Sequence, residues 1–117
     1  MAENTQTAIV SGPDDHGIGE ELSTLGATVS RIEGAVSADA LNAAGIDAAD
    51  HLVLTDVEEA TGIAVAKELN PSVTVVTYAT RSLPEFIAGL ADIAVDPALM
   101  GPDVVAAELV ADTPDGG

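Results

Sequence analysis

Short apolar runs, rich in β-branched residues, alternate along the chain with stretches that have helical spacing. Strands are predicted over residues 7–11, 28–32, 51–55, 73–78 and 93–95. Helices are predicted over residues 18–25, 37–44, 56–69, 82–90 and 104–110. The run over residues 51–55 is continuously apolar at its centre, which is typical of a strand buried on both faces.

Capping residues support these boundaries. Ser37 stands where a helix N-cap is expected, and Gly26 and Gly45 stand where helices commonly end. Asp56 with Glu59, and Ser82 with Glu85, have the spacing of a capping box.

Strands that alternate with helices predict a parallel sheet covered on both faces. The expected fold class is therefore α/β: a doubly wound, Rossmann-like or flavodoxin-like sheet of about five strands in a three-layer αβα arrangement. The expected organisation is a flexible N-terminus over residues 1–6, a single domain over 7–110 and a disordered acidic tail over 111–117.

The charge is strongly acidic: 20 acidic residues stand against three basic ones, Arg31, Lys67 and Arg81, and the net charge is −17. Such a surface repels nucleic acid and anionic lipid, which excludes binding to either through bare charge. An acidic surface nearly free of lysine is typical of proteins that work in molar salt, where the screening length falls to about 3 Å. Acidity is therefore interpreted as a sign of salt adaptation, and a partner-binding acidic face is the alternative interpretation.

Several chemistries have no support in the sequence. There is no cysteine, so disulfides and thiolate metal sites are excluded. Neither a membrane-spanning run nor a signal pattern is present, so a cytoplasmic location without membrane insertion is expected. His16 and His51 are far apart, and no nucleophile elbow, catalytic triad or Walker loop occurs. The sequence predicts neither an enzyme nor a metal site.

Ligands of open parallel sheets bind beyond the carboxyl ends of the strands. The first such end is followed by Gly12, Gly17 and Gly19, which predicts a glycine-bearing loop at a helix N-terminus. Gly19 has the position that packs a helix against a sheet, and an ordinary turn is the alternative interpretation.

The other strand ends add charged candidates to this edge. Glu33 could accept hydrogen bonds from ribose hydroxyls, or it could be one more exposed acid. Asp56, after Thr55, is a helix cap or a functional carboxylate. Arg81 is the basic residue expected here, opposed by several acids that include Asp96, so a bare phosphate would be repelled.

Part of the chain resembles the N-terminal, nucleotide-binding lobe of regulator-of-K⁺-conductance proteins, the TrkA-N type. The resemblance is carried by residues 44–47, 49–56, 58–60, 66–71, 73–76 and 91–97. It implies a dimerising, Rossmann-like domain that binds NAD or an adenine nucleotide and regulates potassium transport. By position it implies that Gly17 and Gly19 form the glycine loop, that Glu33 binds ribose and that Thr55 and Asp56 lie near the ligand.

A second resemblance is to the receiver domains of response regulators. Asp14 and Asp15, the run over residues 52–57 and Thr77 carry it. It implies that Asp56 accepts a phosphoryl group and that Asp14 and Asp15 hold Mg²⁺. Where receivers have a lysine near the last strand, this chain has Asp96.

Three hypotheses therefore remain open. The first is a stand-alone nucleotide-sensing domain, a homodimer that regulates a membrane-transport or signalling protein. The second is a receiver or degenerate receiver, and the third is a protein-interaction module without a ligand. Strand order discriminates between the first two, because a receiver has order 2-1-3-4-5 and a Rossmann half has a further strand beyond the second.

Overall fold

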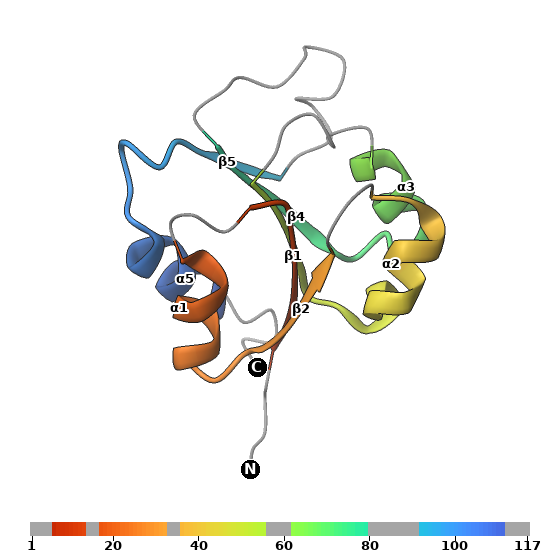
Figure 1. Cartoon of the computed structure of the whole chain (residues 1–117), viewed down its shortest axis with the longest axis horizontal. Coiled ribbons are helices and arrows are strands. Elements are labelled where there is room, and N and C mark those ends of the chain that lie inside the picture. The colour runs from red at the N-terminus through yellow and green to blue at the C-terminus, as the bar shows by residue number, and fades with distance from the viewer. Residues whose placement is uncertain (1–5, 14–16, 33–35, 56–61, 80–91, 112–117) are drawn as a thin grey trace.

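All five predicted strands are present, each within one residue of its expected bounds. The structure, a computed structural model, describes residues 6–13, 17–32, 36–55, 62–79 and 92–111 (Figure 1). The strands are β1 (Thr7–Ser11), β2 (Thr28–Ile32), β3 (His51–Leu54), β4 (Thr74–Tyr78) and β5 (Ile93–Val95). The helical elements are α1 (Ile18–Thr24), α2 (Ala38–Ala44), the 3₁₀ turn η1 (Ile46–Ala48), α3 (Gly62–Leu69) and α5 (Pro102–Ala111).

The strands form one parallel sheet in the order β2-β1-β3-β4-β5. This confirms the predicted α/β fold class, in its flavodoxin-like form. The chain starts in the middle of the sheet, adds β2 on one side of β1 and then returns to add β3, β4 and β5 on the other. The order is the one expected of a receiver, since β3 pairs with β1 and no strand of the described residues lies beyond β2.

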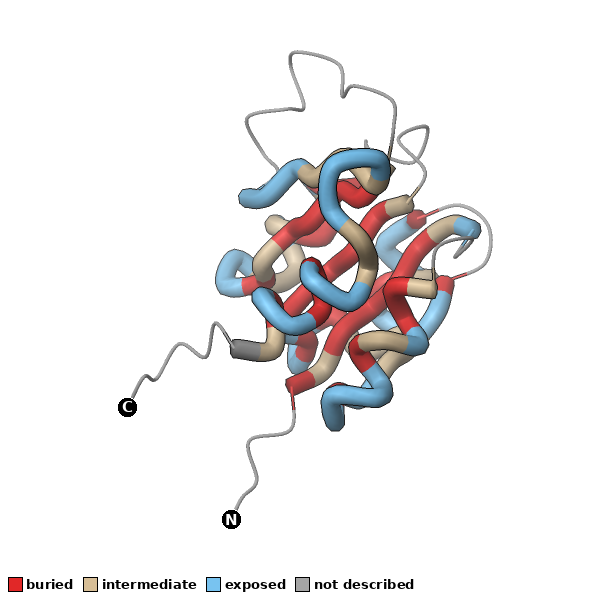
Figure 2. The backbone as a smooth tube through the Cα atoms, turned by 90° about the vertical axis from the view of Figure 1, so that its left-hand side faces the viewer, coloured by how far each residue is buried: buried red, intermediate tan, exposed pale blue. Residues whose placement is uncertain are grey.

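Helices cover both faces of the sheet, as Figure 1 shows: α1 and α5 lie on one side, α2 and α3 on the other. Successive residues of a strand point to opposite faces, so Ile9 packs toward α2 and α3 while Ala8 and Val10 pack toward α1 and α5. Figure 2 shows the central strands as buried along most of their length. Because both faces of the central strands are covered, β1, β3 and β4 are largely apolar, whereas the edge strand β2 alternates and is partly exposed.

The helix ends follow the predicted caps where the structure describes them. The Ala40 amide donates to Ser37 Oγ at 3.2 Å, so Ser37 caps α2. Gly26 and Gly45 have φ of 100° and 88°, which is the left-handed conformation that ends a helix at low cost. The last helix starts at Pro102, two residues before the predicted start, because proline is favoured in the first turn.

Other predictions fall outside the described residues. These are the caps at Asp56 and Ser82, the helix predicted over residues 82–90, most of the expected flexible N-terminus and the tail after residue 111. They remain predictions.

Candidate functional site

Parallel pairing brings the carboxyl ends of the described strands to one edge of the sheet, as predicted. In the register, Ser11 is beside Leu54, Leu54 beside Thr77, and Tyr78 beside Val95. The residues that follow these ends therefore share what we call the carboxyl edge. Three of the predicted site residues, Glu33, Asp56 and Arg81, lie outside the described residues, as do Asp14, Asp15 and His16.

Thr55, a predicted site residue, lies at this edge but its hydroxyl bonds to the protein backbone. Thr55 Oγ1 donates to the carbonyl oxygen of Ser11 at 3.1 Å and also contacts that of Pro13. The Thr55 amide donates to the same Ser11 oxygen at 2.9 Å. Gly12, with φ of 100°, makes the bend that brings the loop after β1 to β3. Thr55 and Gly12 thus hold this loop across the end of β3.

The two glycines at the start of α1 have local roles. Gly17 is the N-cap residue of α1 and has φ of 80°, a conformation that side chains rarely adopt. Its carbonyl oxygen accepts a bond from the Glu21 amide at 3.0 Å. Gly19 is buried in the first turn of α1. These positions fit the turn-and-packing interpretation of the glycines.

At the tip of β5 the edge carries an acid. Asp96 Oδ1 accepts a hydrogen bond from the Ala98 amide at 2.9 Å, and the Asp96 carbonyl oxygen accepts bonds from the amides of Leu99 and Met100. Asp96 therefore both adds negative charge to the carboxyl edge and shapes the loop that leaves it.

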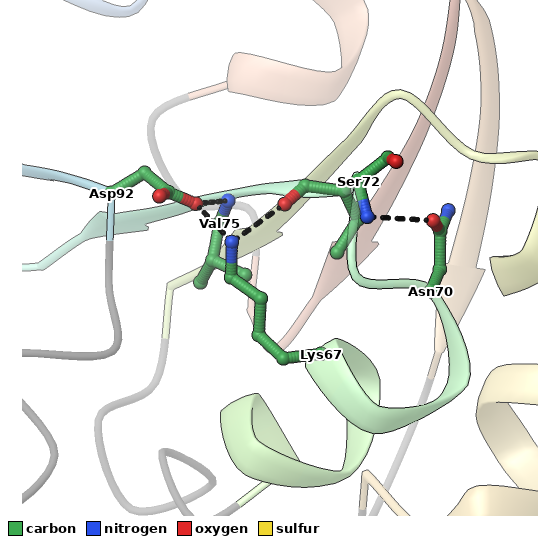
Figure 3. Close-up of polar contacts among 6 residues, drawn as sticks. Lys67, Asn70, Ser72, Val75 and Asp92 are labelled. Carbon is green, nitrogen blue, oxygen red and sulfur yellow. Dashed lines mark hydrogen bonds and ion pairs between the residues drawn. The ribbon is translucent and has the colours of Figure 1, made fainter.

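The only lysine of the chain lies at the opposite edge (Figure 3). Lys67, in the last turn of α3, donates from Nζ to the carbonyl oxygen of Val73 at 2.9 Å and to Asp92 Oδ2 at 2.7 Å. Val73 directly precedes β4, so this ammonium group lies at the amino ends of the strands. It cannot serve a ligand at the carboxyl edge while it makes these contacts.

Asp92, the partner of Lys67, also joins the start of β5 to β4. Its Oδ2 accepts from the Val75 amide at 2.8 Å, and its own amide donates to the Val75 carbonyl oxygen at 2.9 Å. Partial burial raises the pKa of Asp92, but the hydrogen bonds from Lys67 and Val75 and the Lys67 charge outweigh it. They hold that pKa below its ordinary value of 3.8.

Asp50 repeats the arrangement at the start of β3. The Thr7 amide donates to Asp50 Oδ2 at 2.8 Å, and the Asp50 amide donates to the Thr7 carbonyl oxygen at 2.8 Å. An aspartate just before a parallel strand thus pairs with both backbone groups of one residue on the neighbouring strand. Neither role is predicted from the sequence, although both aspartates directly precede a predicted strand.

Two buried hydroxyl residues flank Leu54 near the carboxyl edge. Ser11 and Thr77 are 1% and 4% exposed, and the register puts each beside Leu54. Within the described residues Ser11 Oγ has no hydrogen-bond partner. Thr77 is part of the receiver resemblance, whereas no site role was predicted for Ser11.

His51 has a structural role. Its Nε2 bonds to Gln6 Oε1, and Gln6 Nε2 donates to the carbonyl oxygen of Val110 at 3.0 Å. The three residues join the starts of β1 and β3 to the last turn of α5. Over the described ranges, no group of three or more acidic or histidine side chains could hold a metal ion. No helix in the described part of the chain is long and apolar enough to cross a membrane.

The fold is shared with solved structures of low sequence identity. A putative pilus assembly-related protein from Burkholderia pseudomallei is 16% identical, with a TM-score of 0.66 over 95% of this chain and 91% of that chain. An atypical orphan response regulator with a phosphorylation-independent regulatory mechanism is 16% identical, with a TM-score of 0.69 over 91% and 93%. The BeF3-activated DrrB receiver domain is 23% identical, with a TM-score of 0.63 over 92% and 96%. No curated protein sequence matches the chain.

These similarities correct one set of expectations. The prediction of a TrkA-N-type, nucleotide-binding domain in potassium transport is wrong: the similar structures are response-regulator and pilus-assembly proteins. The physical reason lies in the third strand. A buried apolar run that ends in an acid fits both folds, so residues 51–56 do not show by themselves whether they pair with β1 or lie beyond β2. In the structure β3 pairs with β1, and no described strand lies beyond β2, where a Rossmann half has its further strand.

One similarity in sequence covers almost the whole domain. A family model described as a family of unknown function, DUF7126, matches residues 8–109, a range that runs from β1 to α5. The chain therefore belongs to the DUF7126 family.

Proposed function

We propose that this protein is a degenerate receiver-like signalling domain, one that acts through protein contacts and not by accepting a phosphoryl group. The observation that carries the proposal is the separation of charge across the sheet. The only lysine bonds to Val73 and Asp92 at the amino edge, while Asp96 lies at the tip of β5 on the carboxyl edge. No catalytic step is part of the proposal.

Electrostatics argue against a phosphoryl group at the carboxyl edge. A phosphoryl group brings nearly two negative charges, and these need a cation nearby. In the sequence, Asp14, Asp15 and Asp56 follow the ends of β1 and β3, and Asp96 occupies the tip of β5. Arg31 lies on β2 beside Val10, so β1 separates it from the end of β3. Mg²⁺ and Arg81, the basic residue expected at this edge, could offset part of this repulsion, but the lysine of an active receiver is missing.

The loop contacts support the same interpretation. The hydroxyl of Thr55 bonds to the backbone of the β1 loop, and the Asp96 carboxylate caps its own turn. These two side chains at the carboxyl edge are thus engaged by the protein itself. Similarity to a regulator described as phosphorylation-independent adds support.

The proposal is tested by treating the protein with acetyl phosphate and Mg²⁺ in molar KCl and measuring its intact mass. The expected result is no phosphoryl adduct in the wild type, and an unchanged mass for the Asp56→Asn control. An active receiver treated in parallel shows that the phosphodonor works. An adduct that forms in the wild type and disappears in Asp56→Asn would refute the proposal and make Asp56 a phosphoacceptor.

A further inference from the structure

Large apolar side chains lie exposed along one stretch of the chain. Ile93, Leu99, Met100 and Val104, here called the β5–α5 patch, are 36%, 85%, 37% and 46% exposed. They belong to β5, the loop after it and the first turn of α5. Among the described residues the remaining exposed large apolar side chain is Leu25, at the end of α1. Exposed apolar groups that gather in one place are typical of a surface that binds a partner.

The loop that carries Leu99 is fixed by hydrogen bonds. The Leu99 and Met100 amides donate to the Asp96 carbonyl oxygen at 2.8 and 3.2 Å, and the Ala98 amide donates to Asp96 Oδ1 at 2.9 Å. The hydroxyl of buried Tyr78 donates to the Met100 carbonyl oxygen at 2.9 Å. Because the loop is already ordered, a partner that binds Leu99 loses little free energy in ordering it.

The Tyr78 contact ties the patch to the core of the sheet. Tyr78 is 1% exposed, and its ring packs in the apolar layer between the sheet and the helices α1 and α5. Burial and, to a lesser degree, the nearby Asp103 carboxylate raise the pKa of the Tyr78 hydroxyl, so it stays protonated and able to donate. Leu99 is thus presented from a loop anchored in the protein interior.

The charged residues nearest Leu99 and Val104 in the described sequence are acids. Asp103 and Glu108 are exposed and Asp96 is half-buried, whereas Asp92 pairs with Lys67; residues 92–110 contain no lysine or arginine. Protein interfaces commonly have an apolar centre and a polar rim whose charges match those of the partner. A second copy of this chain would bring another net charge of −17 and an equally acidic rim.

We propose that the β5–α5 patch binds a partner protein that presents an apolar surface bordered by lysine or arginine, as a basic amphipathic helix does. Leu99 inserts into the apolar surface, and the surrounding carboxylates pair with the basic side chains. The inference rests on the proposed function, because a domain that acts by protein contact needs such a surface.

The test is an NMR titration of the ¹⁵N-labelled protein with a basic amphipathic helical peptide, leucine on one face and lysine at its borders. It is run at the KCl concentration that gives the highest melting temperature. The expected shift changes are confined to residues 93–104 and their contacts. Leu99→Ser should weaken binding about tenfold, whereas Leu25→Ser, which removes an exposed leucine elsewhere, should change it less than about twofold. Both variants should melt within a few degrees of the wild type, since both side chains are exposed.

Four results would overturn the inference. If a scrambled peptide of the same composition binds equally well, net charge alone explains the binding, and the apolar face of the helix is not recognised. Unchanged binding by Leu99→Ser would remove the patch from the interaction. A wild-type dimer that Leu99→Ser converts to a monomer would make a second copy the occupant. Failure of the peptide to bind, with no phosphoryl adduct formed, would refute this inference alone, whereas an adduct at Asp56 would refute the proposed function.

Discussion

Alanine at position 62 is expected to lower the free energy of unfolding by about 1–3 kcal/mol. A Cβ atom on Gly62 would lie 2.5 Å from Val36 Cγ1, 2.7 Å from Val36 Cβ and 3.0 Å from the Val36 carbonyl oxygen. Carbon atoms pack at about 3.5–4.0 Å, so α3 or the segment that enters α2 must move. In an unhindered helix the same change stabilises by up to about 1 kcal/mol, so the sign of the effect is diagnostic. Urea unfolding in KCl measures it.

A double-mutant cycle with Val36→Ala isolates the contact. Val36→Ala removes the nearest of the three clashing atoms, so the double variant should lose less stability than the sum of the two single changes. Recovery should be partial, because Val36 keeps its Cβ and its carbonyl oxygen. Additive effects would show that Gly62 and Val36 do not meet, and that the start of α3 lies elsewhere.

Asp92→Ala is expected to cost about 1–2 kcal/mol, because it removes the acceptor of two hydrogen bonds. The Val75 amide and one donor position of Lys67 would lose their partner, and Val75 itself is fully buried. Since the Asp92 side chain is 42% exposed, water can replace part of what is lost, which keeps the estimate modest. Asp47, also exposed, provides the matched control: Asp47→Ala should change the unfolding free energy by less than about 0.5 kcal/mol.

The pH dependence of stability distinguishes the ionic contact of Asp92 with Lys67 from its hydrogen bond with the Val75 amide. Its pKa is lower in the folded protein than its ordinary value, so ionised Asp92 stabilises the fold above that value. This contribution disappears as the pH falls through the folded-state pKa. Asp92→Asn keeps an oxygen for the Val75 amide but has no charge, so its stability should fall less steeply in acid than that of the wild type. Equal slopes for both proteins would contradict an ionic Lys67–Asp92 contact.

Four strands could be predicted because each is a short, largely apolar run, and β2 because β-branched and polar residues alternate along it. The fold class followed from their alternation with helices. The position of the third strand could not, because residues 51–54 are buried on both faces and would fit beside β1 or beyond β2. The apolar pattern of a strand does not specify which neighbour it pairs with. The TrkA-N interpretation failed at this point.

The candidate site was predictable in place but not in detail. Parallel strands require that the residues after β1, β3, β4 and β5 share an edge, and they do. The bond from Thr55 to the loop backbone depends on the bend at Gly12, which no local pattern specifies. The bond of Lys67 at the opposite edge depends on Asp92, which is distant in sequence. Contacts between distant residues are set by packing, and a single sequence does not display them.

Binding of beryllofluoride, a mimic of the phosphoryl group, tests the central claim most directly. ¹⁹F NMR of the protein with beryllofluoride and Mg²⁺ in molar KCl detects bound fluoride separately from free fluoride. Because the carboxyl edge carries acids and the lysine is engaged elsewhere, only the free species should appear. A bound, Mg²⁺-dependent signal that vanishes in Asp56→Asn would contradict the account and establish a working phosphoacceptor site.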